Sequence, residues 1–279
     1  NTPLWNRALS DDERIEWLLG EMTVDEKLTC LSSQAPDIER LGIPGFALGG
    51  EAAHGVEARN DQNDLGKAEV TTSFPQPSGM SATWDTELIQ KAGEVTGKEA
   101  RVIYHRHPDR GLSRWAPTVD IERDPRWGRN EEGYGEDPVL TGAMAGAYIR
   151  GMQGNDQYYI RTAATLKHFY GNNTENGRGW KSSSIDPRNK YELYLEPFRR
   201  CIEDAGAAGV MTAYNKINGT VGLFNKEVQE ILKDKYGLMH AVSDGGAMEL
   251  VAKSNHYYGF NAESIASSIK AGVDAMSDA

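Results

Sequence analysis

Reactive side chains follow short apolar segments at several places in this sequence. Lys167 and His168 stand near the end of one such segment, and Tyr214 follows another. Asp244 closes a third segment and is followed by two glycines, and Glu51 comes directly after a Gly-Gly pair. An ionised carboxylate held at the end of a strand can act as a nucleophile. Lysine and histidine donate hydrogen bonds, so they suit a polar, hydroxyl-rich ligand.

The elements that must position these groups alternate between two kinds. Short apolar, glycine-bounded runs alternate with amphipathic stretches, a pattern typical of βα units. The runs predict strands over 46–50, 72–81, 112–121, 163–171, 209–215, 238–244 and 273–277. Helices are expected near 23–33, 86–104, 137–152, 188–205, 225–235 and 262–271.

This pattern indicates the fold class α/β, as a single (β/α)8 barrel with some irregular units. Residues 1–40 are expected to form an N-terminal arm with the first helix, and residues 41–279 the barrel core. In such barrels the chemistry gathers at the carboxyl ends of the strands, which is where the reactive residues fall.

The bulk composition limits the possible partners. The 279 residues carry a net charge of -11, which repels phosphate backbones and argues against nucleic acid. No apolar run reaches the roughly 18 residues that a membrane span requires. No signal-type segment is present, so a cytoplasmic protein is expected rather than a secreted one. The pattern of His, Cys and carboxylates predicts no metal, and no organic cofactor is expected.

Motifs along the chain resemble the N-terminal catalytic barrel of family 3 glycoside hydrolases. In chain order they read PTVDIERDPRWGRNEEGYGEDP, LKHFYGNNTENGR, VMTAYNKING and VSDGGA. The resemblance extends from about Leu41 to Asp244 and implies a retaining, exo-acting β-glycosidase. Such an enzyme uses an ionised carboxylate to form a covalent glycosyl intermediate.

The resemblance implies roles for individual residues. Asp244 corresponds to the nucleophile, although a helix-capping aspartate would be the structural alternative. The residues expected to bind sugar are Glu51, Trp115, Arg129, Lys167, His168, Arg178 and Tyr214. Gly245 stands where many members carry a large aromatic residue, which predicts an open aglycone side. The carboxylates Asp120 and Glu132 are interpreted as structural.

The second group that retaining hydrolysis needs, an acid/base, has no evident counterpart. In the family it is a His in a loop after the Lys-His strand, or a Glu from a following α/β sandwich domain. The loop here contains no His, and no such domain is present, so we expect that domain to act as a partner. Glu175 is the nearest internal candidate.

The sugar depends on the residues before Glu51. Xyloside-cleaving members often carry a Trp two positions before this acidic residue, and this chain has Gly49 there. An open position would admit the hydroxymethyl group of a hexose, so a terminal β-D-glucosyl residue is expected. The EAAHGV segment resembles the xylosidase branch, which keeps a β-xylosidase or α-L-arabinofuranosidase as the alternative. A non-catalytic sugar-binding barrel is the third possibility.

Overall fold

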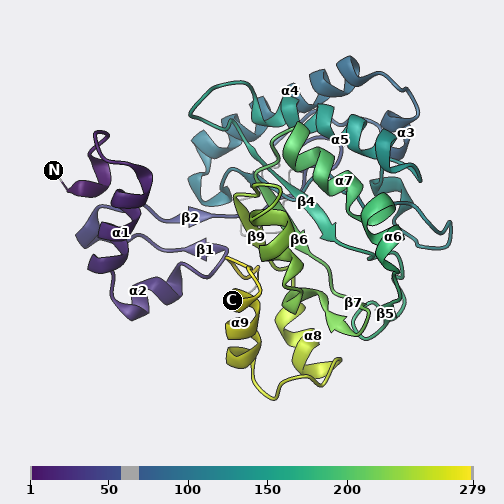
Figure 1. Ribbon diagram of the computed structural model, residues 1–279. Coiled ribbons are helices and arrows are strands. Elements are labelled where there is room, and N and C mark those ends of the chain that lie inside the picture. The colour runs from purple at the N-terminus through teal and green to yellow at the C-terminus, as the bar shows by residue number, and fades with distance from the viewer. Residues whose placement is uncertain (1, 58–68, 278–279) are drawn as a thin grey trace.

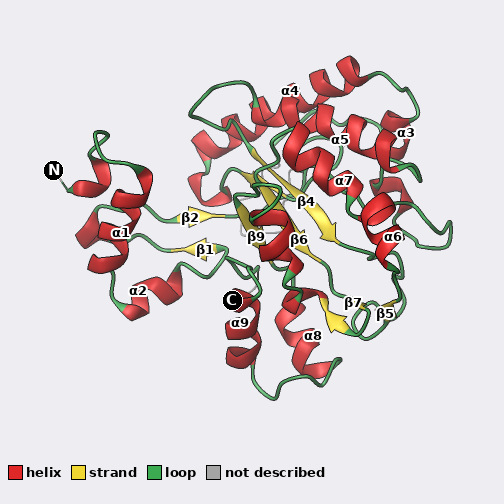
Figure 2. Cartoon of the chain, viewed as in Figure 1, coloured by secondary structure: helices red, strands yellow, loops and turns green. Residues whose placement is uncertain are grey.

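The computed structural model describes residues 2–57 and 69–277 as a mixed α/β structure, with helices around a central sheet (Figures 1 and 2). The α-helices are α1 (Asp11–Glu21), α2 (Val24–Thr29), α3 (Pro77–Ser81), α4 (Thr86–Arg106), α5 (Pro138–Gln153), α6 (Pro187–Asn189), α7 (Glu196–Arg199), α8 (Ala247–Lys253) and α9 (Asn261–Lys270). The strands are β1 (Gln34–Ala35), β2 (Phe46–Ala47), β3 (Ser113–Arg114), β4 (Ala163–Phe169), β5 (Ser182–Ser183), β6 (Gly209–Thr212), β7 (Lys216–Ile217), β8 (Thr220–Val221) and β9 (His240–Val242).

The central sheet is parallel, with its strands in the order β3-β4-β6-β9. Thr165 pairs with Gly209, and Gly209 pairs with His240. Nearly all of β4 is buried, as expected for a parallel strand whose two faces are covered. The burial extends to Lys167 and His168, so these polar side chains must find partners inside the protein.

Backbone hydrogen bonds outside the central strands continue this sheet from β9 round to β3. They include Ser243 N to Ala275 O at 3.0 Å, Ser33 N to Met276 O at 3.0 Å, Leu48 N to Ser33 O at 2.7 Å and Trp115 N to Gly50 O at 2.9 Å. Within this ring β1 and β2 are antiparallel. The α/β class and the expectation of an irregular barrel are therefore confirmed, but regular eightfold repetition is not formed by the described residues.

The pair α4 and α5 packs closely because glycines face the neighbouring backbone. A Cβ atom on Gly93 would lie 2.3 Å from the carbonyl oxygen of Tyr148, and one on Gly97 would lie 2.4 Å from that of Met152. The buried Tyr148 hydroxyl in turn donates a 2.8 Å hydrogen bond to the carbonyl oxygen of Ala52. Helix α5 thereby holds the segment that carries Glu51.

Several expected elements differ from the structure. The strand expected over 72–81 is wrong, because Pro77–Ser81 forms α3, with Pro77 in the first helical turn, where its missing N–H costs nothing. The helix expected over 23–33 ends at Thr29. The 188–205 helix exists but contains π-helical turns at Lys190–Tyr194 and Arg200–Asp204. Pro197 lies between these turns and cannot donate a backbone hydrogen bond.

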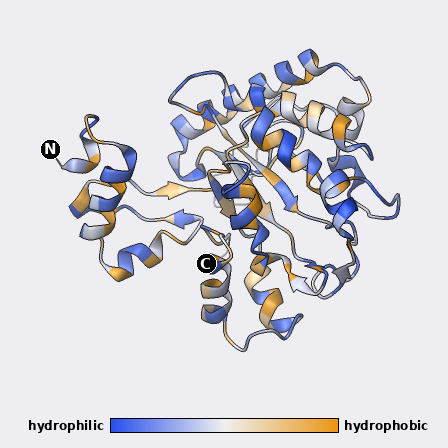
Figure 3. Ribbon diagram, in the orientation of Figure 1, coloured by the Kyte–Doolittle hydropathy of each residue, from blue (hydrophilic) through white to orange (hydrophobic). Residues whose placement is uncertain are grey.

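The N-terminal helices α1 and α2 lie to one side of the main body, to which β1 and β2 connect them (Figure 1). Capping boxes at Ser10 and Thr23 begin the two helices. Both helices show hydrophilic and hydrophobic residues side by side (Figure 3). The division at residue 40 stays a prediction. Among the described residues, no helix has both the length and the apolar character needed to cross a membrane.

Candidate active site

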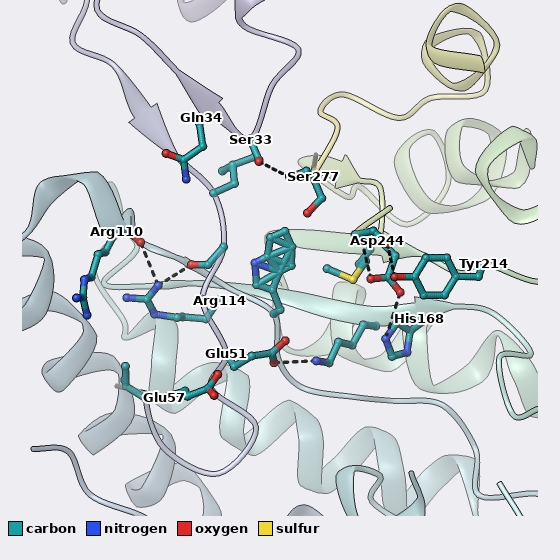
Figure 4. Close-up of a pocket in the computed structure, with 18 of the residues that line it drawn as sticks. Ser33, Gln34, Glu51, Glu57, Arg110, Arg114, His168, Tyr214, Asp244 and Ser277 are labelled. Carbon is teal, nitrogen blue, oxygen red and sulfur yellow. Dashed lines mark hydrogen bonds and ion pairs between the residues drawn. The ribbon is translucent and has the colours of Figure 1, made fainter. Parts of the chain in front are cut away.

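A cavity of about 720 Å³ lies where the carboxyl ends of the central strands meet. Its lining contains the expected nucleophile, all the residues expected to bind sugar and the glycine expected on the aglycone side, namely Glu51, Trp115, Arg129, Lys167, His168, Arg178, Tyr214, Asp244 and Gly245. Figure 4 shows Asp244, Tyr214 and His168 on one side of this cavity, with Arg114 and Glu57 toward the other. The structure thus brings the predicted residues together, while their individual roles stay predictions.

Lys167 is the centre of a charged network at one wall. Its ammonium lies 2.8 Å from Oε2 of Glu51 and 3.8 Å from Oε2 of Glu132. The guanidinium of Arg129 donates two hydrogen bonds to the carboxylate of Glu132, of 2.7 and 2.9 Å. Burial alone would raise the pKa of Glu132, but the hydrogen bonds from Arg129 and the charge of Lys167 outweigh it and lower the pKa to about 2. Glu132 is therefore an anion at neutral pH and cannot serve as a proton donor there.

His168 is held between two carboxylates. Its Nδ1 lies 2.8 Å from Oδ2 of Asp120, and its backbone N–H donates to the same oxygen at 2.9 Å. Its Nε2 lies 3.7 Å from Oδ2 of Asp244. The side chain of Asp120 is fully buried and that of His168 is 2% exposed, so this line of groups is shielded from solvent.

Asp244 follows β9 and reaches into the cavity with a side chain that is 14% exposed. Its Oδ1 accepts a 2.7 Å hydrogen bond from the backbone N–H of Gly245, whereas Oδ2 is buried and has no hydrogen-bond partner among the described residues. The Tyr214 hydroxyl donates to the carbonyl oxygen of Gly245. The guanidinium of Arg178 lies 4.5 Å above the Tyr214 ring, a cation–π arrangement.

A helix-capping role for Asp244 does not agree with the structure. Helix α8 begins at Ala247, its N-cap is Gly246, and no side chain caps it. The carboxylate of Asp244 is thus available to the cavity.

The space beside Gly49, two positions before Glu51, is occupied. A Cβ atom on Gly49 would lie 2.6 Å from Nε1 of Trp115, so the indole occupies the room in which a side chain of residue 49 would begin. A Cβ atom on Gly50 would lie 2.3 Å from Nη1 of Arg114. The reason for expecting a hexose, an unfilled position at Gly49, is therefore wrong: a tryptophan from the β3 segment fills it.

Two carboxylates support residues of the site without lining the cavity. Asp120 and Glu132, interpreted as structural from the sequence, contact His168, Lys167 and Arg129 directly. Both carboxylates lie in the sequence motif that also contains Arg129. Besides the predicted residues, Ser33, Gln34 and Ser277 line the cavity. Ser33 and Gln34 belong to the N-terminal part of the chain and Ser277 to its C-terminal part. No local sequence pattern indicated that they would line the same cavity.

Glu175, the internal candidate for a proton donor, is bound to a cation. Its Oε1 accepts a 2.5 Å hydrogen bond from Arg178, and it is absent from the lining of the main cavity. Its Oε2 is buried and has no hydrogen-bond partner among the described residues. Within residues 2–57 and 69–277, His, Cys, Asp and Glu side chains form no group of three suited to a metal ion.

Comparison with known proteins agrees with this architecture. Residues 25–277 match the model of the glycosyl hydrolase family 3 N-terminal domain. The chain belongs to glycosyl hydrolase family 3. It is 33% identical to beta-D-xylosidase 3 of Arabidopsis thaliana over 98% of this chain and 36% of that protein.

Two solved structures extend the comparison. An exo-beta-xylosidase in complex with a xylobiose aziridine activity-based probe superimposes with a TM-score of 0.89 at 31% identity, covering 99% of this chain and 37% of the other. The beta-glucosidase of Kluyveromyces marxianus gives a TM-score of 0.78 at 30% identity, with coverages of 95% and 29%. The chain therefore spans between 29% and 37% of the length of these relatives.

Proposed function

We propose that this chain forms the glycone-binding and nucleophile-bearing part of a retaining, exo-acting β-glycosidase, with Asp244 as the nucleophile. The observation that carries the proposal is the placement of Asp244. Its Oδ2, which has no hydrogen-bond partner in the described part of the chain, lies in a cavity whose walls hold Lys167, His168, Arg129 and Arg178. A short carboxylate fixed at a strand end suits attack on an anomeric carbon, and the cationic and imidazole groups suit binding of sugar hydroxyls.

We further propose a terminal β-D-xylosyl residue as the preferred glycone. The indole of Trp115 against Gly49 supplies bulk beside Glu51, where a hydroxymethyl group would need room. The relatives named β-xylosidases and the TM-score of 0.89 to an exo-β-xylosidase support the same choice. A β-D-glucosyl glycone is the second candidate, supported by the structural likeness to a β-glucosidase.

The acid/base is proposed to come from an α/β sandwich domain that joins this cavity from the same chain or from a separate chain. The pKa of Glu132 is too low for the role, and Glu175 is bound to Arg178. General acid catalysis contributes roughly 10²–10⁴-fold, so the chain alone should need a substrate with a good leaving group.

Covalent trapping tests the nucleophile. The chain is incubated with 2,4-dinitrophenyl 2-deoxy-2-fluoro-β-D-xyloside or the matching glucoside, and peptides are sequenced by mass spectrometry. The expected result is a glycosyl adduct on Asp244, absent from the Asp244→Asn variant and present in Asp234→Asn, an aspartate variant outside the cavity. An adduct on another residue, or none in folded chain, would refute the assignment.

A further inference from the structure

The imidazole of His168 has one side fixed by Asp120. An ionised carboxylate only accepts hydrogen bonds, so the 2.8 Å contact requires a proton on Nδ1 of His168. The backbone N–H of His168 donates to the same Oδ2 at 2.9 Å, which fixes that oxygen at one point relative to the ring. With Asp120 fully buried, solvent does not compete for these bonds.

The opposite side of the ring faces the nucleophile. Nε2 of His168 lies 3.7 Å from Oδ2 of Asp244, too long for a direct hydrogen bond. With Nδ1 protonated, Nε2 of a neutral imidazole is an acceptor, and Oδ2 of Asp244 is also an acceptor. Two acceptors that face each other at this spacing require a donor from elsewhere. A sugar hydroxyl supplies one, since its O–H can point to either atom.

We propose that Asp120 is a positioning residue that keeps His168 in the Nδ1–H form, so that Nε2 accepts a hydrogen bond from a glycone hydroxyl beside Asp244. This inference rests on the proposed glycosidase function and deepens it. Without Asp120 the proton can move to Nε2, where it would point at the nucleophile. A hydrogen bond donated to Asp244 would stabilise the attacking carboxylate before reaction and compete with the sugar hydroxyl.

The first measurement reports the tautomer without any substrate. Long-range ¹⁵N–¹H correlation spectra of the histidine-labelled chain resolve the ring nitrogens of its six histidines. His168 is assigned by the signals missing from a His168→Gln variant. In the parent chain, the expected pattern is a protonated Nδ1 and an unprotonated Nε2. In Asp120→Ala, the expected pattern is a mixed or reversed one.

The second measurement reports the chemistry. The rate of dinitrophenolate release from 2,4-dinitrophenyl β-D-xyloside or β-D-glucoside follows formation of the glycosyl intermediate, which needs little help from an acid. Misplacing a group by about 1 Å costs on the order of 10²-fold, and Asp120→Ala should slow release by about that factor. Asp120→Asn should keep the Nδ1–H pattern and lose less than about tenfold, because its oxygen must still accept the backbone N–H of His168.

Asp124→Asn is the matched control. Asp124 lies in the same loop, but it forms an ion pair with Arg126 and does not line the cavity. It should leave spectrum and rate unchanged. If Asp120→Ala keeps both the Nδ1–H pattern and the parent rate, the proposal is overturned. If Asp120→Ala does not fold, the Asn variant decides: a reversed tautomer with an unchanged rate refutes the proposal. Failure of the glycosidase function itself would appear separately, as absent release in the parent chain with the Nδ1–H pattern intact.

Discussion

The ammonium of Lys167 and the carboxylate of Glu51 lie 2.8 Å apart, although 116 positions separate them in the sequence. The Lys167 side chain is only 4% exposed, whereas that of Glu51 is 38% exposed and faces the cavity. Lys167 therefore anchors the carboxylate of Glu51 at the wall of the cavity. Glu132 stands 3.8 Å away as a second counter-charge.

The Glu51→Gln variant should bind monosaccharide more weakly while the chain stays folded. A hydrogen bond to a charged group contributes about 1.5–3 kcal/mol, so the dissociation constant of D-xylose or D-glucose should rise roughly 10- to 100-fold. Titration calorimetry measures the change. Glu249→Gln is the control, because Glu249 forms an exposed pair with Lys253 and should leave sugar binding unaltered. Equal losses in both variants would contradict a specific role for Glu51.

Glu132 should make the stability of the chain sensitive to acid. Its pKa is about 2 in the folded chain, below the ordinary 4.5. A lowered folded-state pKa contributes stability that is fully present above pH 4.5 and is lost as the pH falls toward 2. The Glu132→Gln variant should be less stable than the parent at pH 7, by on the order of 2 kcal/mol, and the difference should shrink between pH 5 and 2. Urea unfolding across this range tests the expectation; a difference that does not depend on pH would refute it.

Trp115 should determine how well a hexose is excluded. Removing the indole in Trp115→Ala opens space beside Gly49, so the ratio of glucoside to xyloside turnover should rise by about tenfold or more. Initial rates with the two dinitrophenyl glycosides give this ratio. Trp180→Ala serves as the control, because Trp180 is 60% exposed and does not line the cavity. If the ratio stays constant, Trp115 does not form the boundary of the glycone pocket.

Gly245 should determine which leaving groups the site accepts. The positive φ at this turn belongs to Gly246, at 69°, so a side chain on Gly245 meets no strain of that kind. Gly245→Trp should change the relative rates for bulky and small aryl leaving groups several-fold, with little effect on the choice between glucoside and xyloside. Rates over a series of aryl glycosides measure both effects. A change only in the preference between glucoside and xyloside would indicate that residue 245 lies on the glycone side of the scissile bond, and would contradict the prediction.

Much of the fold was predictable because its signals are local. Helices α4 and α5 have strong amphipathic or small-residue patterns, with Asp85 and Asp137 as caps. Strand β4 reads as an apolar run. The 72–81 segment was misassigned because its apolar residues do not distinguish a buried strand from extended chain that enters a short helix. The antiparallel pairing of β1 with β2 depends on contacts between distant segments, which no local pattern encodes.

The sequence by itself determined the family of this chain and predicted which residues would gather at one site. The order and spacing of its motifs were enough to indicate the family, and the rule that sites gather at strand ends predicted which side chains would meet. Only the tertiary structure decided how they meet. It placed Asp120 against His168 and Glu132 between Arg129 and Lys167, and it set Trp115 over Gly49. Apart from the Arg129–Glu132 pair, which is local, these contacts join segments that are distant in the sequence. They are fixed by strand register and side-chain direction, so the sequence could indicate the residues but not their partners.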